Sequence, residues 1–510
     1  MRVYKLDSRS IWEDETFTLL HSTGQGQDAD FLLNSEYNAT GLRTTKPLPS
    51  ERYLSFLRYN PHKGLKDIAI SILTTDTQPP LFFIIMHFWM RYFGATLFSL
   101  RFLSVLFSIG SIICAFLFAS KLFSKRAGIF SALFIAVSPF VIFYAREMRH
   151  YSLILTIALL SSYLLVRFKK DSRVIFPIGF ILSSALGLYT HYFYIFILLA
   201  HAIYFLFFSD CATEKKNKFC TAFLVTLFLF SPWVLAVLRY GYNFRFTEWL
   251  FGVPNNIIVI TGVIFNKLIL FFIVLDNKSA VCNILNILFI ICLFLLVKIL
   301  FKVKKELVLP SIIFIFPVLF LALVGLLENS TIFLQERYYT FALVGLTPMV
   351  GQMLSANWEK RVNRIIIILF FSILVMNSLL VINGLGWENV SVPRTKNACL
   401  WIRQELQQGR TAIITFNRRA RVLPMAFYLD KNTVIAPIND FDELKNSFRE
   451  FGTNINTVFV VEPVFEYQNN YPIEAQSSGK EILDTGFVLK EKRDFGNDRI
   501  KVIKLIRVKG

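Results

Sequence analysis

Residues 99–122 read SLRFLSVLFSIGSIICAFLFASKL and form the first of many long apolar stretches in this chain. A helix of about 20 apolar residues crosses a bilayer. The chain has 510 residues, of which 55% are hydrophobic and 17% charged. A soluble protein of this composition could not cover its apolar surface. We therefore expect an all-α polytopic membrane bundle.

The apolar stretches predict ten membrane spans. They lie at 99–122, 127–145, 151–168, 174–189, 192–208, 219–238, 280–301, 307–327, 338–356 and 365–383. Short basic clusters between them mark cytoplasmic loops by the positive-inside rule. These clusters are 121–126, 167–173, 215–218, 298–305 and 360–364. The apolar runs 81–93 and 257–275 are expected to be interfacial or re-entrant, because counting either as a span would place a basic cluster outside.

This topology places residues 1–98 and everything after residue 383 on the external side. An external N-terminal segment of this length would need a preceding span, so we expect one before Met1, with residues 1–6 as its external end. From residue 393 to 510 the pattern is that of a small α/β domain. It predicts a helix at 397–408 and strands at 411–416, 457–462 and 500–508.

The net charge of +19 is explained by these basic loops rather than by a nucleic-acid site. The six cysteines form no CxxC or metal-like spacing, so we predict neither a disulfide framework nor a zinc site.

Four short polar stretches, with His191-Tyr192 as a fifth candidate, fall on the external side. They are 12–15 (WEDE), 76–81 (DTQPPL) with the nearby Arg101, 144–151 (YAREMRHY) and 335–339 (QERYY). Each has an ordinary structural interpretation, as an interfacial turn, a helix start or an aromatic anchor at a span end. Arg146 and Arg149 differ, since arginine is uncommon in external loops and two of them favour a bound anion.

Together these stretches would place acids and arginines at one membrane surface. Transfer of a group from a lipid-linked phosphosugar needs such a set. A carboxylate accepts the proton of the acceptor hydroxyl. Arginines and tyrosines hold the lipid phosphate while negative charge develops on it.

The motifs, in their order along the chain, resemble the bacterial protein-mannosyltransferase-like branch of the glycosyltransferase C superfamily. Relatives include protein O-mannosyltransferases and lipid A aminoarabinose transferases. The residues that carry the resemblance are SIWEDE (10–15), QPPLFF (78–83), LRFLS (100–104), SPF (138–140) and REMRHYSL (146–153), extended by ERY (336–338). It is strongest over residues 8–205.

The resemblance implies a membrane-embedded helical bundle, interfacial helices in the first external loop and a small external C-terminal α/β domain. It also implies a polyprenyl-phosphate sugar donor and an inverting transfer, either metal-independent or assisted by a divalent cation. By position, Asp14 is the catalytic base, Glu15 supports it and Glu147 is a second acid. The positions suited to binding the donor are Arg149, Tyr151, Arg337, Tyr338, Arg101, Gln78 and His191. Two departures from the family are the absent first span and Gln78, where some members carry lysine.

The sequence thus predicts a multi-pass glycosyltransferase of a bacterial inner membrane, acting on its external side. The acceptor would be a hydroxyl of a lipid, glycan or protein, and the partners include membrane lipids but no nucleic acid. A transporter or lipid flippase is the alternative, but it would need ionisable residues inside the spans and a repeated span pattern. A third alternative is a non-catalytic scaffold that displays the C-terminal domain.

Overall fold

A computed structural model describes most of the chain. The described residues are 1–29, 47–76, 78–240, 256–273, 284, 305–383, 395–406, 411–416, 418–438, 447–448, 455–463, 487–495 and 500–507. The chain divides into two compact units. The membrane unit comprises Met1–Leu6 and Ile72–Trp387, and the α/β unit comprises Asp7–Ser71 and Glu388–Gly510.

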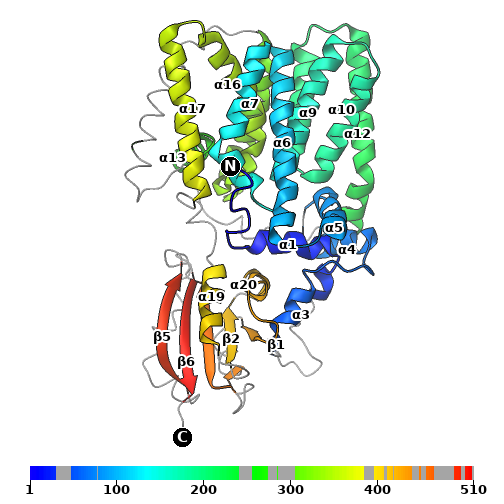
Figure 1. The fold of residues 1–510 in the computed structure, drawn as a ribbon. Coiled ribbons are helices and arrows are strands. Elements are labelled where there is room, and N and C mark those ends of the chain that lie inside the picture. The colour runs from blue at the N-terminus through cyan, green and yellow to red at the C-terminus, as the bar shows by residue number, and fades with distance from the viewer. Residues whose placement is uncertain are drawn as a thin grey trace. The chain divides into compact units, whose positions relative to one another are not determined.

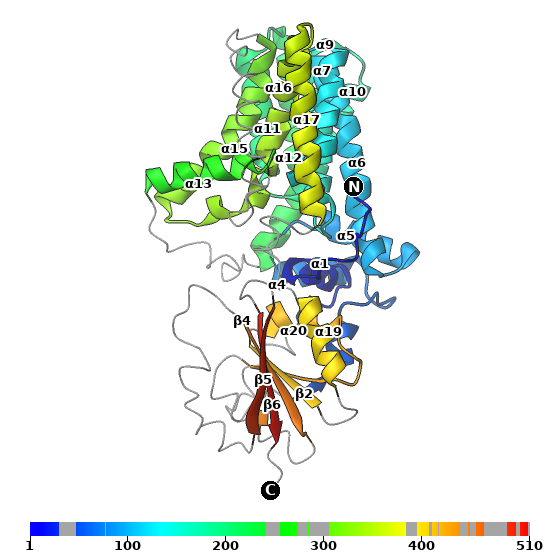
Figure 2. The same ribbon diagram turned by 60° about the vertical axis from the view of Figure 1, so that its left-hand side comes forward.

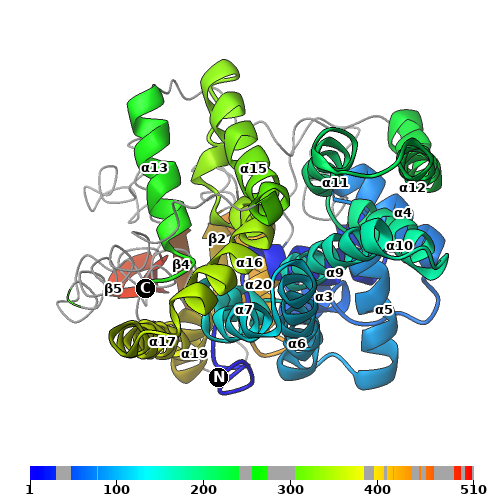
Figure 3. The same cartoon turned by 90° about the horizontal axis from the view of Figure 1, so that it is seen from above.

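The membrane unit is a helical bundle, and α5 is the first helix that lies wholly within it. Its helices are α5 (Leu81–Phe93), α6 (Leu97–Leu122), α7 (Lys125–Val137), α8 (Pro139–Ala145), α9 (Tyr151–Lys170), α10 (Ile175–Thr190), α11 (Tyr194–Ile203) with the π-helical turn η1 (Tyr204–Phe208), α12 (Thr213–Tyr240), α13 (Ile257–Ile269), the 3-10 turn η4 (Lys305–Leu307), α15 (Val308–Leu327), the 3-10 turns η5 (Ile332–Leu334) and η6 (Glu336–Tyr339), α16 (Thr340–Asn357) and α17 (Arg361–Ile382). Helices α6, α7, α9 and α16 run alongside one another, as Figure 1 and the view from above in Figure 3 show.

Among the described residues, five helices are long and apolar enough to cross a membrane. They are α6, α9, α12, α15 together with η4, and α17. The pair α7 and α8 passes the same test as one span bent by 59°. Every predicted span falls on a helix of the bundle except 280–301, of which the structure describes residue 284 alone.

The two runs that were predicted not to span form short helices. Helices α5 and α13 have 13 residues each, or about 20 Å at 1.5 Å per residue, which is less than the ~30 Å hydrocarbon core. Helix α5 lies across the end of α6 in Figure 1, and α13 lies across the direction of α16 and α17 in Figure 2. Both therefore match the interfacial or re-entrant interpretation.

The α/β unit is built on one six-stranded mixed sheet. Its elements are α1 (Glu13–Ser22), β1 (Leu48–Pro49), α3 (Ser50–Ser55), α19 (Thr395–Glu405), β2 (Thr411–Phe416), α20 (Arg418–Ala426), β3 (Val434–Ile438), β4 (Thr457–Pro463), β5 (Phe487–Phe495) and β6 (Ile500–Arg507), and α4 (Leu65–Thr75) contains the boundary between the units. The strand order is β1-β3-β2-β4-β6-β5, with β2 parallel to both β3 and β4 and the other pairs antiparallel.

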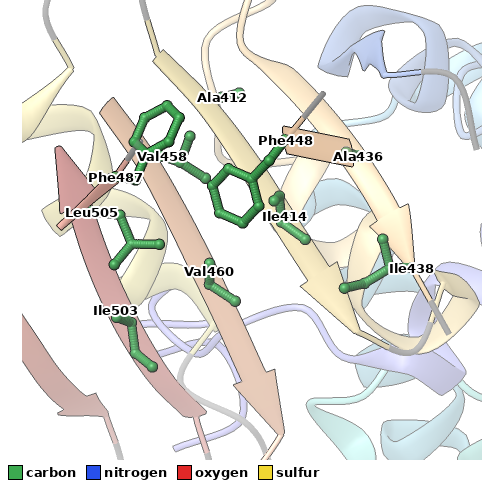
Figure 4. Close-up of a cluster of buried hydrophobic side chains, with 10 residues drawn as sticks. All are labelled: Ala412, Ile414, Ala436, Ile438, Phe448, Val458, Val460, Phe487, Ile503 and Leu505. Carbon is green, nitrogen blue, oxygen red and sulfur yellow. The ribbon is translucent and has the colours of Figure 1, made fainter. Parts of the chain in front are cut away.

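Apolar side chains of both central and outer strands form the core of this sheet. Phe448 and Phe487 pack over Ile414, Val458 and other strand residues (Figure 4). On the helix α19, Trp401 packs its ring 5.5 Å from that of Phe459. The predicted helix and all three predicted C-terminal strands are confirmed.

The N-terminal part of the chain contributes to this unit. Leu48 pairs with Ile435, so β1 forms the edge of the C-terminal sheet. The backbone N–H of Ile11, just before α1, donates to the Tyr428 hydroxyl at 2.6 Å. Residues 7–71 thus fold with the C-terminal domain, whereas the sequence suggested a separate first loop over 1–98.

Candidate active site

Three segments of the membrane unit meet through aromatic and imidazole rings. They are the loop 146–150 between α8 and α9, the turn 191–193 between α10 and α11, and the 3-10 turn η6. The ring of His191 lies 5.0 Å from that of His150 and 6.0 Å from that of Tyr338. The structure therefore brings together three of the five stretches that the sequence singled out.

A break between α7 and α8 leads the chain to this place. Pro139 cannot donate the N–H of a continuous helix and crowds the carbonyl four residues earlier. That carbonyl, of Ile135, accepts from Arg2 Nη2 at 2.8 Å, and the Ala136 carbonyl accepts from Arg2 Nη1 at 2.7 Å. The bend thus has a local cause, and the freed carbonyls accept hydrogen bonds from the half-buried guanidinium of Arg2.

Arg146 and Arg101 hold the backbone of the N-terminal residues. Arg146 Nη1 donates to the Tyr4 carbonyl at 2.6 Å and Nη2 to the Lys5 carbonyl at 3.1 Å. Arg101 is fully buried, and its Nη1 donates to the Leu6 carbonyl at 2.9 Å. Arg146, an uncommon residue type for an external loop, therefore has a structural role in binding these carbonyls.

Arg149 and Glu147 are buried in the same loop, being 5% and 1% exposed. The Arg149 guanidinium lies 6.0 Å from the centre of the Tyr151 ring. The backbone carbonyl of Arg149 accepts a hydrogen bond from Ser104 Oγ at 3.3 Å, which connects the loop to α6. A buried cation that stands beside an aromatic ring suits an anionic ligand.

The imidazole of His191 has a defined tautomer. The backbone N–H of Phe193 donates to His191 Nδ1 at 3.0 Å, so Nδ1 carries no proton and the neutral ring carries it on Nε2. Burial, with the charges of Arg149 and Arg337 adding to it, lowers the pKa of His191 to about 3. The ring is therefore neutral at physiological pH and presents an Nε2–H donor.

His150 is the neighbour of that ring. It is 1% exposed, and its ring is 4.5 Å from that of Tyr151. Burial, followed by the charges of Arg149, His191 and Arg337, lowers the pKa of His150 well below its usual value. Within the part of the chain that the structure describes, no hydrogen-bond partner meets the buried Nε2 atoms of His150 and His191.

The turn η6 adds a third charged segment. Arg337 is half-buried and donates from Nη2 to Gln335 Oε1 at 3.0 Å. Glu336 forms an ion pair with Lys267 of α13 at 2.5 Å. The Tyr338 ring packs 4.8 Å from that of Phe193. The turn is thus held by α13 through Glu336 and by the 191–193 turn through Tyr338.

Asp14 and Glu15 belong to the α/β unit, in the first turn of α1. Negative side chains are favoured there by the helix dipole. Asp14 is half-buried and Glu15 is fully buried. Thr18 Oγ1 donates to the Asp14 carbonyl at 3.0 Å, which secures the first turn of the helix.

Gln78 lies just before α5 in the membrane unit. Its Oε1 is buried and has no hydrogen-bond partner among the described residues. In the same described part of the chain, no group of three or more His, Cys, Asp or Glu side chains is placed to hold a metal ion.

Two residues of this cluster were not assigned a role from the sequence. His150 stands within the quoted 144–151 stretch, but nothing in the sequence indicated that it would face His191. Lys267 had a usable signal, because it is a lone cation inside the apolar run 257–275, and such residues in membrane segments are usually functional or paired.

The chain was compared with known protein families and sequences. Residues 77–236 match the sequence model of a family described as dolichyl-phosphate-mannose-protein mannosyltransferase. This match covers less than half of the chain. No curated protein sequence matches the chain significantly.

Two solved structures share the fold along nearly the whole chain. The crystal structure of ArnT from Cupriavidus metallidurans in the apo state matches with a TM-score of 0.54 and 10% identity, covering 97% of this chain and 94% of that one. The same protein bound to undecaprenyl phosphate matches with a TM-score of 0.54 and 11% identity, covering 98% and 95%. The predicted resemblance is confirmed: the chain has the glycosyltransferase C fold, a polytopic bundle with a small C-terminal α/β domain.

Proposed function

We propose that the chain is an integral membrane glycosyltransferase. It transfers a sugar from a polyprenyl-phosphate donor to a hydroxyl group of an extracytoplasmic lipid, glycan or protein. The observation that carries this proposal is the meeting of Arg149, Arg337 and the neutral His191 at one end of an apolar bundle with the glycosyltransferase C fold.

The donor phosphate binds to the arginines. Both Arg149 and Arg337 act on the pKa of His191 and His150, so their charges reach the same small region. Guanidinium groups bind phosphate oxygens in pairs of hydrogen bonds. Tyr151 and Tyr338 flank this region with their rings and hydroxyl groups. A polyprenyl-phosphate donor also fits the undecaprenyl phosphate bound in the ArnT structure of the same fold.

Asp14 is the proposed base. Its carboxylate accepts the proton of the acceptor hydroxyl, whose oxygen attacks the anomeric carbon in line with the departing phosphate, inverting that carbon. Glu15 supports the base, and Glu147 is a second acid. The transferred sugar is a hexose or a pentose, and a divalent cation is compatible with this chemistry.

Arg101 and Gln78 are proposed as further contacts to the donor. The buried, unpartnered Oε1 of Gln78 supports its assignment, since an amide can meet a sugar hydroxyl. Arg101 is fully buried and donates from Nη1 to the Leu6 carbonyl, so its guanidinium would serve the backbone and the donor together.

The basic residues support an external site. Lys170 at the end of α9 donates to the Lys121 carbonyl at 3.1 Å, and Lys215 of α12 donates to the Lys169 carbonyl at 2.8 Å. These lysines are separated from the 146–150 loop by the 20 residues of α9, about 30 Å of helix. The positive-inside rule assigns such lysines to the cytoplasmic side, which supports an arginine-histidine cluster on the opposite side, the periplasm in the case of a bacterial inner membrane.

A transporter or flippase without glycosyl transfer is the alternative function. The family whose sequence model matches residues 77–236 is one of mannosyltransferases and not of transporters. Mass spectrometry of surface glycans and glycolipids tests the choice. A deletion strain should lack one glycosyl group that the wild-type gene restores and the Asp14→Asn gene does not. Unchanged glycans and glycolipids in the deletion strain would contradict the proposal.

A further inference from the structure

The two buried histidines have a chemistry that the arginines cannot supply. Arg149 and Arg337 are cationic whether or not the donor has reacted. His191 is neutral and has one donor, Nε2–H, whose direction is fixed by the Phe193 N–H bond to Nδ1. His150 adds a second buried ring nitrogen within the same cluster. Burying such a donor without a partner costs free energy, so the arrangement is suited to a ligand.

The bound ligand changes its charge during the proposed reaction. The acceptor oxygen forms a bond to the anomeric carbon, and its proton passes to the Asp14 carboxylate. The bond between the anomeric carbon and the phosphate oxygen breaks, and its electron pair stays on that oxygen. The lipid phosphate thus changes from a singly charged diester to a doubly charged monoester.

We propose that His191 is a leaving-group residue, whose uncharged Nε2–H donates a hydrogen bond to the lipid phosphate, and that His150 completes this donor site. This inference rests on the proposed function. The hydrogen bond strengthens as the second negative charge develops, because bonds to fully charged acceptors are stronger. Interactions that strengthen in the transition state raise kcat rather than lower KM.

Two neutral imidazoles beside two arginines act differently from a cluster of four cations. Two imidazolium ions would attract both lipids through net charge and would hold the doubly charged product most tightly. A neutral donor discriminates between the two lipids without trapping the product by charge alone. The site should therefore prefer the monoester modestly over a diester of the same lipid.

The chain offers a matched set of substitutions. In His191→Asn the side-chain oxygen still accepts the Phe193 N–H, but the amide does not reach the Nε2 position. In His191→Gln the amide N–H reaches the Nε2 position. His201 of α11 is a control, since this buried histidine contacts Ser162 Oγ through Nε2 at 3.0 Å and lies outside the cluster.

The experiment measures binding of two lipids, polyprenyl phosphate and its methyl diester, to the detergent-purified full chain. His191→Asn should weaken polyprenyl phosphate binding about tenfold and diester binding less than threefold. It should also lower kcat about 100-fold with little change in the KM for the donor. His191→Gln should retain both properties within about fivefold, and His201→Gln should match the wild type.

Two results would overturn the inference in distinguishable ways. If the wild type binds polyprenyl phosphate and His191→Asn, folded as judged by its melting temperature, shows the wild-type lipid preference and kcat, His191 is not a leaving-group residue. If His191→Asn does not fold, the preference for polyprenyl phosphate over the diester is compared between His191→Gln and His150→Phe. An equal preference in these two variants contradicts the inference. If the wild type binds neither lipid, the proposed function fails and the inference fails with it.

Discussion

Lys267 Nζ donates to Glu336 Oε1 at 2.5 Å, which joins α13 to the turn that carries Arg337. Both side chains are largely covered, with exposed fractions of 20% and 25%. The pair therefore anchors the turn on which Arg337 lies. A helix too short to span the membrane would thus have a definite use beside the site.

This relationship predicts the effect of breaking the pair. Lys267→Met or Glu336→Gln should lower transfer about fivefold, because the pair contributes about 1 kcal/mol to the placement of η6. The double variant should be no worse than either single one. The measurement is a double-mutant cycle on the transfer rate, and fully additive losses would show that the two residues act separately.

Arg146 and Arg149 should behave differently although they are three residues apart. Arg146→Met should lower the free energy of unfolding by about 3 kcal/mol, because the carbonyls of Tyr4 and Lys5 lose their charged donor. Arg149→Met should retain more of that stability and lower transfer at least 100-fold through loss of the phosphate contact. Thermal unfolding and transfer rates of both purified variants check this prediction. It is contradicted if both variants lose only stability or both lose only transfer.

The acidic residues of α1 give a second matched comparison. Asp14→Asn removes the proposed base while keeping the size of the side chain, so transfer should fall at least 1,000-fold. Glu13→Gln, in the same first turn, should reduce transfer less than threefold. Equal losses in both variants would indicate that the first turn needs negative charge rather than one base.

The buried histidines predict how stability depends on pH. The pKa of His191 is about 3 in the folded protein and about 6.5 when unfolded. Between these values the unfolded chain binds a proton that the folded chain does not, so stability falls as pH falls below about 6.5. The loss is about 1.4 kcal/mol per pH unit for His191, and His150 adds to it in the same direction.

The pH prediction is tested by comparing slopes. Melting temperatures from pH 7 to pH 4.5 should fall more steeply for the wild type than for His191→Asn, which cannot take up that proton. Both should show the same slope above pH 7. Parallel curves over the whole range would mean that His191 is not neutral and buried in the folded chain.

Much of the fold follows from local patterns in the sequence. Apolar length alone indicates α6, α9, α12, α15 and α17, and charge at the loops distinguishes the short helices α5 and α13 from spans. Short runs rich in β-branched and other apolar residues indicate β2, β4 and β6. Strand β1 could not be predicted, because two residues with a proline carry no strand pattern, and only pairing with β3 defines them.

The motifs that form the site could be predicted from the sequence, but the contacts between their side chains could not. Position in the predicted topology brought the 146–151 and 336–338 stretches to one membrane surface. That Arg146 would bind backbone carbonyls while Arg149 stands beside Tyr151 depends on tertiary packing. The same holds for the His150–His191 contact, since 40 residues separate the two rings along the chain.

The proposed function requires that this chain consumes a polyprenyl-phosphate sugar. The most direct measurement is the release of polyprenyl phosphate, followed by mass spectrometry, in proteoliposomes that contain the purified chain, a panel of such donor lipids and a membrane extract as the source of acceptors. We predict that the wild type releases polyprenyl phosphate from at least one donor, while Asp14→Asn and Arg149→Met release none above background. Release that is equal in all three proteins, or absent from the folded wild type with every donor, would show that the chain is not such a glycosyltransferase.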